Sequence, residues 1–198
     1  KAVMSAADRK AAYAAAQKAL TLMAGVTELE QDYILAQATR FNGDANTDRV
    51  PLDIAYAGAM EAVSEKYPDN YDAASLFAEA LMNTMPWNYW ADDGNPRPDT
   101  VKVISKLEIV LEQQPDHPLA LHLYIHAVEA SSAPGRAEPA ADMLADLVPG
   151  AGHLVHMPAH IYWRVGRYND ASEANIRAAD VDEEYIAQCN AQGFYPAL

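Results

Sequence analysis

Five of the chain's six histidines lie between residues 118 and 167. Two of them, His122 and His126, recur 34 residues later as His156 and His160, within the similar phrases HLYIHAVE and HMPAHIYW. Imidazole nitrogens suit zinc, copper, iron and nickel ions, so a repeated group of histidines points first to a transition-metal site. The metal that would bind there stays open among these four.

The spacing predicts that each copy presents its imidazoles from one helical face. His122, His126 and Glu129 follow an i, i+4, i+7 pattern, which at 3.6 residues per turn places them within an arc of about 60°. The opposite side carries residues expected to pack: Leu121, Tyr124, Ile125 and Val128. His153 lies one turn before His156 on nearly the same face. Stacked helices are expected to bring four imidazoles into one square: His122, His126, His156 and His160.

Composition narrows the classes of partner. The 198 residues include 28 acidic and 14 basic side chains, a formal charge of −14, which argues against nucleic acid and anionic membrane surfaces. A lone Cys189 excludes an internal disulfide framework and a cysteine-based zinc site. No stretch is long and apolar enough to span a bilayer, and the residues from Lys1 onward show no signal-peptide pattern. A soluble protein is expected, with cytoplasm and periplasm both open.

Helical periodicity and turn residues predict an all-α chain. The first five helices are expected at about 5–24, 27–41, 51–66, 70–82 and 100–114. Thr27 and Glu30 have the spacing of a capping box. Small or apolar residues expected to be buried between helices are Ala59, Leu107, Ala141 and Ala178. A central β-sheet would contradict this interpretation.

The repeat period and the spacing of the proline-containing turns resemble those of tetratricopeptide repeats. Pro115 and Pro149 are 34 residues apart, and the positions where that repeat favours Gly, an aromatic residue and two small residues hold Gly166, Tyr168, Ala171 and Ala178. The chain is also similar, over roughly residues 30–198, to a bacterial family with phrases like LFAEALMNTMPWNYW, LHLYIHAVEAS and LVPGAGHLVHMPAHIYWRVGRY. The resemblance implies a right-handed superhelix of antiparallel helix pairs in a single domain, 1–198. Its repeats would span about 27–70, 71–117 with an insertion at 85–98, 118–151 and 152–185.

The resemblance also implies that positions 2, 5, 9 and 12 of the first helix of each repeat line a concave, ligand-binding groove. These positions are Asp72, Ser75, Glu79 and Met82, then Leu119, His122, His126 and Glu129, then His153, His156, His160 and Trp163. Every helical histidine falls on this predicted groove. The insertion carries Trp87, Tyr89 and Trp90, which either fill the gap that it makes or form a lid over the groove near His126 and His160.

The predicted site is a transition metal held chiefly by His122, His126, His156 and His160. Further ligands, or groups that hold the imidazoles, would be His153, Glu129 and Glu79. If one coordination position stays open, bound water or oxygen could be activated there for hydrolysis or oxidation, with Glu129 or Glu79 as candidate general base. Pro158 weakens the helical geometry, because a helix starting near Met157 would leave His153 and His156 in a loop.

Other functions remain open from the sequence. A single histidine on a groove is more often a satisfied polar residue or a peptide contact, and His117, in the turn DHP, is expected to be structural. The alternatives to a metal-dependent enzyme are a metal-free scaffold that binds a peptide, protein or small molecule, and a metal carrier or storage protein. Whether the chain is an enzyme is not decided by the sequence.

The end of the chain predicts association or a longer protein. Solenoids need polar capping helices, whereas this chain stops at GFYPAL, soon after a segment from Asp182 that resembles the start of another helix. Members of the resembling family continue with further repeats. We therefore expect either a fragment of a longer chain or a self-associating protein.

Overall fold

The computed structural model describes residues 4–44 and 46–189, and these residues are almost entirely helical. Their only β-type pairing is one isolated bridge between Trp90 and Pro96. The all-α prediction is confirmed, whereas the superhelical repeat arrangement stays a prediction. Contacts divide the chain into two compact parts, a first unit of residues 1–89 and a second unit of residues 90–198, each described by itself.

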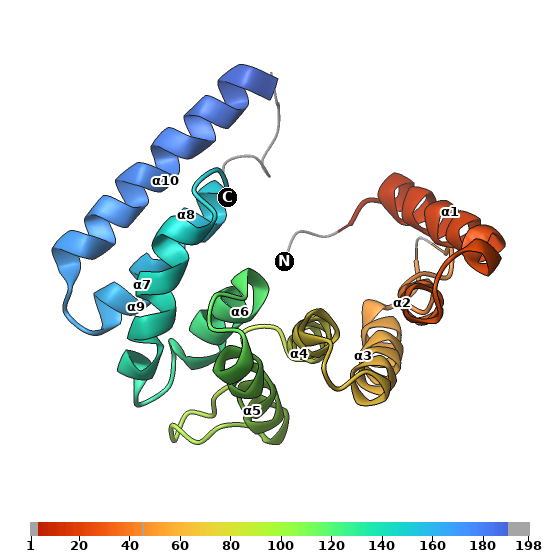
Figure 1. Ribbon diagram of the computed structural model, residues 1–198, viewed down its shortest axis with the longest axis horizontal. Coiled ribbons are helices and arrows are strands. Elements are labelled where there is room, and N and C mark those ends of the chain that lie inside the picture. The colour runs from red at the N-terminus through yellow and green to blue at the C-terminus, as the bar shows by residue number, and fades with distance from the viewer. Residues whose placement is uncertain (1–3, 45, 190–198) are drawn as a thin grey trace. The chain divides into compact units, whose positions relative to one another are not determined.

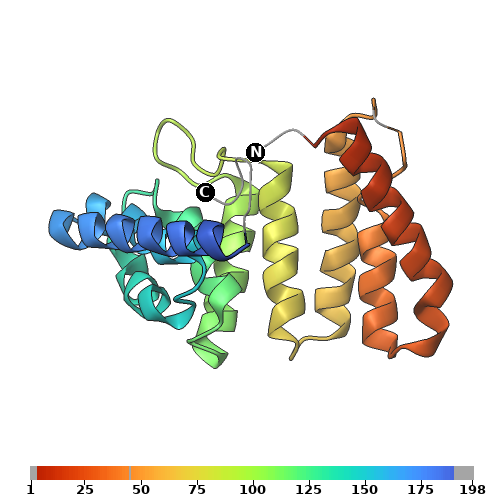
Figure 2. The same cartoon turned by 90° about the horizontal axis from the view of Figure 1, so that it is seen from above.

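The first unit consists of a series of helices, and a longer loop joins its second and third α-helices (Figures 1 and 2). They are α1 (Ala6–Leu22), a 3-10 turn (Met23–Gly25), α2 (Glu28–Ala38), α3 (Arg49–Lys66) and α4 (Tyr71–Thr84). Figure 2 shows α2, α3 and α4 side by side in that order. Their facing sides bury a core of Ala36, Tyr56, Ala57, Met60, Val63, Ala73, Phe77 and Ala80.

Capping residues set the helix starts in this unit. The Thr27 side chain accepts from the Glu30 backbone N–H while the Glu30 carboxylate accepts from that of Thr27, which confirms the predicted capping box. Asp48 caps α3, so this helix begins at Arg49, two residues before the expected Pro51. Helix α2 ends at Ala38, three residues before the expected end at residue 41.

The second unit carries the histidines. It contains α5 (Pro98–Gln113), α6 (Pro118–Val128), a 3-10 turn (Pro134–Ala137), α7 (Glu138–Leu147), α8 (Gly152–His156), α9 (Pro158–Arg164) and α10 (Tyr168–Cys189). Helix α6 packs against α5 and α7, and α10 lies along α8 and α9 (Figure 1). Leu107, Ala141 and Ala178 are buried as predicted, while Ala59 of the first unit is half-buried beside that unit's core.

Two similar polar contacts join neighbouring helices of the second unit. The Tyr124 hydroxyl donates to Glu108 Oε1 on α5 at 2.8 Å, and the Tyr162 hydroxyl donates to Asp142 Oδ1 on α7 at 2.8 Å. Burial and the hydrogen bond to Glu108 raise the pKa of Tyr124 to about 12. Glu108 and Asp142 are 34 residues apart, the same period as the histidine pairs. These contacts fix α6 and α9, whose other faces bear imidazoles.

Helix α10 is continuous from Tyr168 to Cys189, so the helix expected to start anew at Asp182 does not form there. No glycine or proline interrupts the sequence of α10, which explains why it continues. The Asp182 carboxylate packs against Gly152, where an added Cβ would lie 2.0 Å from Asp182 Oδ1. The terminal phrase GFYPAL falls outside the described residues. Among those described, no helix has the length and apolarity needed to cross a membrane.

Candidate metal centre

Helix α6 separates packing and polar residues between its two faces, as the spacing predicts. Its buried face comprises Leu121, Tyr124, Ile125 and Val128, each at most 6% exposed. His122, His126 and Glu129 lie on the other face and are half-buried. His117 stands apart from them: it is buried, and its Nδ1 accepts from the Ala120 N–H at 3.2 Å, capping the helix. This contact confirms the structural role expected for His117.

His153 and His156 lie on a helical turn and not in a loop. They belong to α8, and Met157, between α8 and α9, keeps helical angles of φ −51° and ψ −38°. Pro158 has no N–H to donate to the preceding turn, yet it is tolerated because it occupies the first position of α9. The break at Pro158 therefore divides the helix without displacing the side chains from their common side.

The five imidazoles of α6, α8 and α9 form a closed ring of neighbours, in which His153 intervenes between His122 and His156. Successive centroid distances around this ring are 4.9 Å (His122–His126), 5.3 Å (His126–His160), 4.8 Å (His160–His156), 6.2 Å (His156–His153) and 5.1 Å (His153–His122). The square expected from the sequence is thus a five-membered arrangement. We call these five residues the histidine ring.

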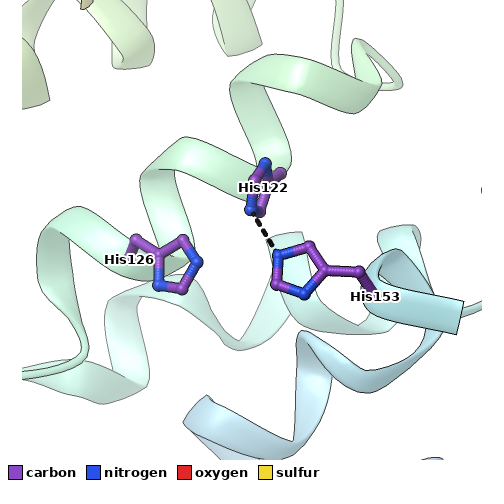
Figure 3. Close-up of side chains that lie close together, drawn as sticks. All are labelled: His122, His126 and His153. Carbon is purple, nitrogen blue, oxygen red and sulfur yellow. Dashed lines mark hydrogen bonds between the residues drawn. The ribbon is translucent and has the colours of Figure 1, made fainter. Parts of the chain in front are cut away.

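Three members of the ring meet closely enough to share one ion. His122 and His126 project from α6 towards His153 of α8 (Figure 3). One nitrogen of each of the three lies within 4.8 Å of the other two, and the Nε2 atoms of His122 and His153 are 3.2 Å apart. His153 is exposed, so this three-histidine group is open to solvent on one side. The structure therefore contains a histidine cluster that could bind a metal.

Glu129 holds two imidazoles at once. Its Oε1 accepts from His126 Nδ1 at 3.2 Å and its Oε2 accepts from His160 Nδ1 at 2.5 Å. Burial raises the pKa of Glu129, but the hydrogen bonds from His126 and His160 more than offset this effect, and the pKa falls to about 2. The ionised carboxylate thereby directs the Nε2 atoms of both rings away from itself. His126, Glu129 and His160 also form a second group whose ligand atoms lie within 4.8 Å of one another.

Asn175 of α10 is a member of the site that the sequence patterns missed. Its Nδ2 donates to Ala171 O at 2.9 Å, so its Oδ1 is the atom that accepts from His156 Nδ1 at 2.6 Å. Asn175 belongs to no histidine phrase and reaches the site only because α10 packs on α8. Sequence spacing alone carried no signal for it.

His122 is held in the form that binds metals. Burial, together with the nearby His126, His153 and His160, lowers its pKa from 6.5 to about 3. The imidazole is therefore neutral at ordinary pH, and neutral imidazole is the ligand form. A proton would not compete effectively with a metal ion for this nitrogen.

The remaining candidates are placed as follows. Glu79, Trp87 and Tyr89 belong to the first unit, where Glu79 Oε1 accepts from Asn83 Nδ2 at 3.4 Å and Trp87 is 66% exposed. Trp90 belongs to the second unit, and its indole N–H donates to Ala127 O at 2.8 Å, next to His126 on α6. The lid and a ligand role for Glu79 stay predictions.

In comparisons with known proteins, no family model matches the chain, and no curated protein or solved structure matches it either. The resemblance to tetratricopeptide repeat proteins therefore stays an expectation. The geometry of the histidine ring is therefore the feature that bears on function.

Proposed function

We propose that the second unit binds a transition-metal ion through His122, His126 and His153. The observation that carries this proposal is the 3.2 Å separation of the His122 and His153 Nε2 atoms. Two nitrogens bound to one tetrahedral zinc ion at about 2.0–2.1 Å lie about 3.3 Å apart. These side chains therefore already have nearly the separation that a bound ion requires, and His126 supplies the third nitrogen of the group.

The charge balance of the site supports the same conclusion. Five imidazoles form the ring, and one carboxylate, that of Glu129, bonds to two of them. Protonated imidazoles would repel one another, and neutral rings direct lone pairs at one another wherever neither ring carries its hydrogen on the nitrogen in contact. A bound cation removes both costs, because the lone pairs then become ligands. A metal ion thus explains why these side chains are collected here.

Three histidine ligands favour a metal-dependent enzyme among the functions considered. Structural zinc sites are closed by four protein ligands, whereas catalytic sites use three and keep water at the fourth position. The exposure of His153 leaves a side from which water and substrate could approach. Glu129 then orients His126 instead of acting as general base, since both of its oxygens are engaged and its pKa of about 2 makes it a weak base.

The experiment is a metal titration of protein purified without a histidine tag and stripped with a chelator. Zinc, cobalt, copper and nickel are tested separately, and at least one equivalent of one of them should bind tightly. The matched control is His117→Asn, which removes the only histidine outside the ring and keeps a residue able to cap α6. If the parent protein takes up none of these ions, the predicted groove is better explained as a metal-free peptide-binding surface.

A further inference from the structure

Two members of the histidine ring lie outside the three-histidine group. His156 of α8 and His160 of α9 are separated by one turn across the break at Pro158, and their Nε2 atoms are 2.9 Å apart. Neither belongs to the group formed by His122, His126 and His153. The ring of His156 is 6.2 Å from that of His153, centroid to centroid. This pair therefore needs an explanation of its own.

The Nδ1 sides of both rings are already occupied. His156 Nδ1 donates to Asn175 Oδ1, whose acceptor identity is fixed by the bond from Asn175 Nδ2 to Ala171 O. His160 Nδ1 donates to the Glu129 carboxylate at 2.5 Å. A neutral imidazole that carries its hydrogen on Nδ1 has a lone pair on Nε2. With both rings neutral and their hydrogens on Nδ1, the two Nε2 atoms that face each other at 2.9 Å are both acceptors.

Two lone pairs at this distance repel unless a proton or a metal ion lies between them. With bonds of about 2.0–2.1 Å, a separation of 2.9 Å corresponds to a nitrogen–metal–nitrogen angle of about 90°. The second ring nitrogens, held by Asn175 and Glu129, have the outer partners that metal-ligating histidines usually have. The pair thus has the separation, the tautomers and the supporting groups of a chelating site.

We propose that His156 and His160 form a second metal position beside the three-histidine position, so that the ring holds two ions. This inference rests on the proposed function and extends it. One ion cannot collect all five nitrogens as they stand, because no group of three or more ligand atoms within 4.8 Å of one another among the described residues includes His156. Glu129 bonds to His126 of the first position and His160 of the second, and its negative charge offsets part of the repulsion between the ions.

The two positions should differ in affinity. The first has three protein ligands and the second has two, so water must complete the coordination of the second ion. A second cation also enters against the charge of the first. We therefore expect two equivalents per chain, filled in sequence, with the weaker equivalent assigned to His156 and His160.

The test is the stoichiometry of zinc binding by the parent, His156→Ala and Asn175→Ala, with His117→Asn as the control. The parent and the control should bind two ions in two phases. His156→Ala should lose the weaker phase and keep the tighter one. Asn175→Ala should keep both phases, with the weaker one shifted by about 10- to 100-fold, the usual cost of losing a partner that orients a ligand.

The outcomes separate the two proposals. One ion in the parent, with His156→Ala weakening that same ion, would overturn the two-position arrangement and leave the proposed function intact. No ion in the parent would overturn both. With copper(II), the doubly loaded parent should also show an electron paramagnetic resonance signal broadened by a neighbouring copper, whereas His156→Ala should give an isolated signal.

Discussion

The molecule contains two polar clusters that differ in whether the ionisable groups have partners of opposite charge. In the first unit, Lys66 Nζ lies 2.6 Å from both Glu28 Oε1 and Asp32 Oδ2, and the Tyr67 hydroxyl donates to Asp32 at 2.8 Å. Each charged group there has its counter-ion within the protein. In the second unit, one carboxylate, that of Glu129, bonds to two of the five imidazoles, and four of the five meet nitrogen to nitrogen.

This difference separates a structural cluster from a functional one. The Lys66 cluster is complete and exposed, so it needs no ligand and contributes little. In the proposed function a cation completes the histidine ring, in which Glu129 and Asn175 hold the Nδ1 atoms of His126, His160 and His156. Imidazoles that are held on one side and face one another on the other favour a site for a ligand that the protein itself does not supply.

The largest effect is expected from changing His126 and His160 to Ala together. His126 belongs to the first metal position and His160 to the second, so both ions should be lost. Metal analysis should show a collapse of bound zinc, while circular dichroism keeps the helical signal because both residues lie outside the apolar core. The matched pair Glu28→Gln and Asp32→Asn, in the Lys66 cluster, should leave metal content unchanged.

Glu129→Gln should weaken metal binding without abolishing it. The amide keeps the size of the side chain but can accept from only one of the two imidazoles, so His126 or His160 loses its orientation. Loss of such a partner typically costs about 10- to 100-fold in affinity, which competition with a chromophoric chelator measures. An unchanged affinity would mean that Glu129 does not position the ligands.

The sequence predicted the components of this site better than their grouping. Helical periodicity placed His122, His126 and Glu129 on one face because neighbouring positions on a helix follow directly from 3.6 residues per turn. The 34-residue offset correctly indicated that the two phrases meet in space. The square was incomplete, because His153 lies between His122 and His156.

Other features depended on packing that spacing does not record. Asn175 reaches His156 from α10, a helix whose own pattern gives no reason to expect a polar contact there.

All-helical architecture was predictable from periodicity and capping, as the Thr27 capping box shows. The new helix expected from Asp182 was wrong, because neither glycine nor proline interrupts α10 there.

The pH dependence of stability should distinguish the two clusters. In the metal-free protein His122 has a pKa of about 3, against an ordinary value of 6.5. Between these two pH values the imidazole is protonated in the unfolded chain but not in the folded chain. The free energy of unfolding should therefore fall as pH is lowered from about 6.5, by at most about 1.4 kcal/mol per pH unit for this group. Above about pH 6.5 His122 is neutral in both the folded and the unfolded chain, so the full free energy of unfolding is present only there.

Urea unfolding of the parent and of His122→Gln, at pH 7 and pH 5, measures this contribution. The variant should lose less stability than the parent between the two pH values. Asp32 acts in a different window: hydrogen bonds from Lys66 and Tyr67 lower its pKa, so its contribution is lost only as pH falls below the ordinary range of a carboxyl group. Equal pH slopes for parent and His122→Gln would contradict the assignment.

The smallest effect is expected from Lys66→Met. Its ion pairs with Glu28 and Asp32 are exposed, and such pairs add little to stability because solvent screens them. Thermal unfolding should shift only slightly, and zinc affinity should not change. A large loss of zinc affinity in this variant would show that the Lys66 cluster is coupled to the metal centre.

X-ray absorption of zinc-loaded, tag-free protein examines the ligands themselves. With one equivalent of zinc, we predict a first shell of nitrogen and oxygen at about 2.0–2.1 Å, with the outer-shell scattering of about three imidazoles. The His122→Gln and His126→Gln double variant should lose most of that imidazole scattering. A spectrum of the parent with oxygen neighbours alone, and no imidazole scattering, would contradict the histidine ring as a metal centre.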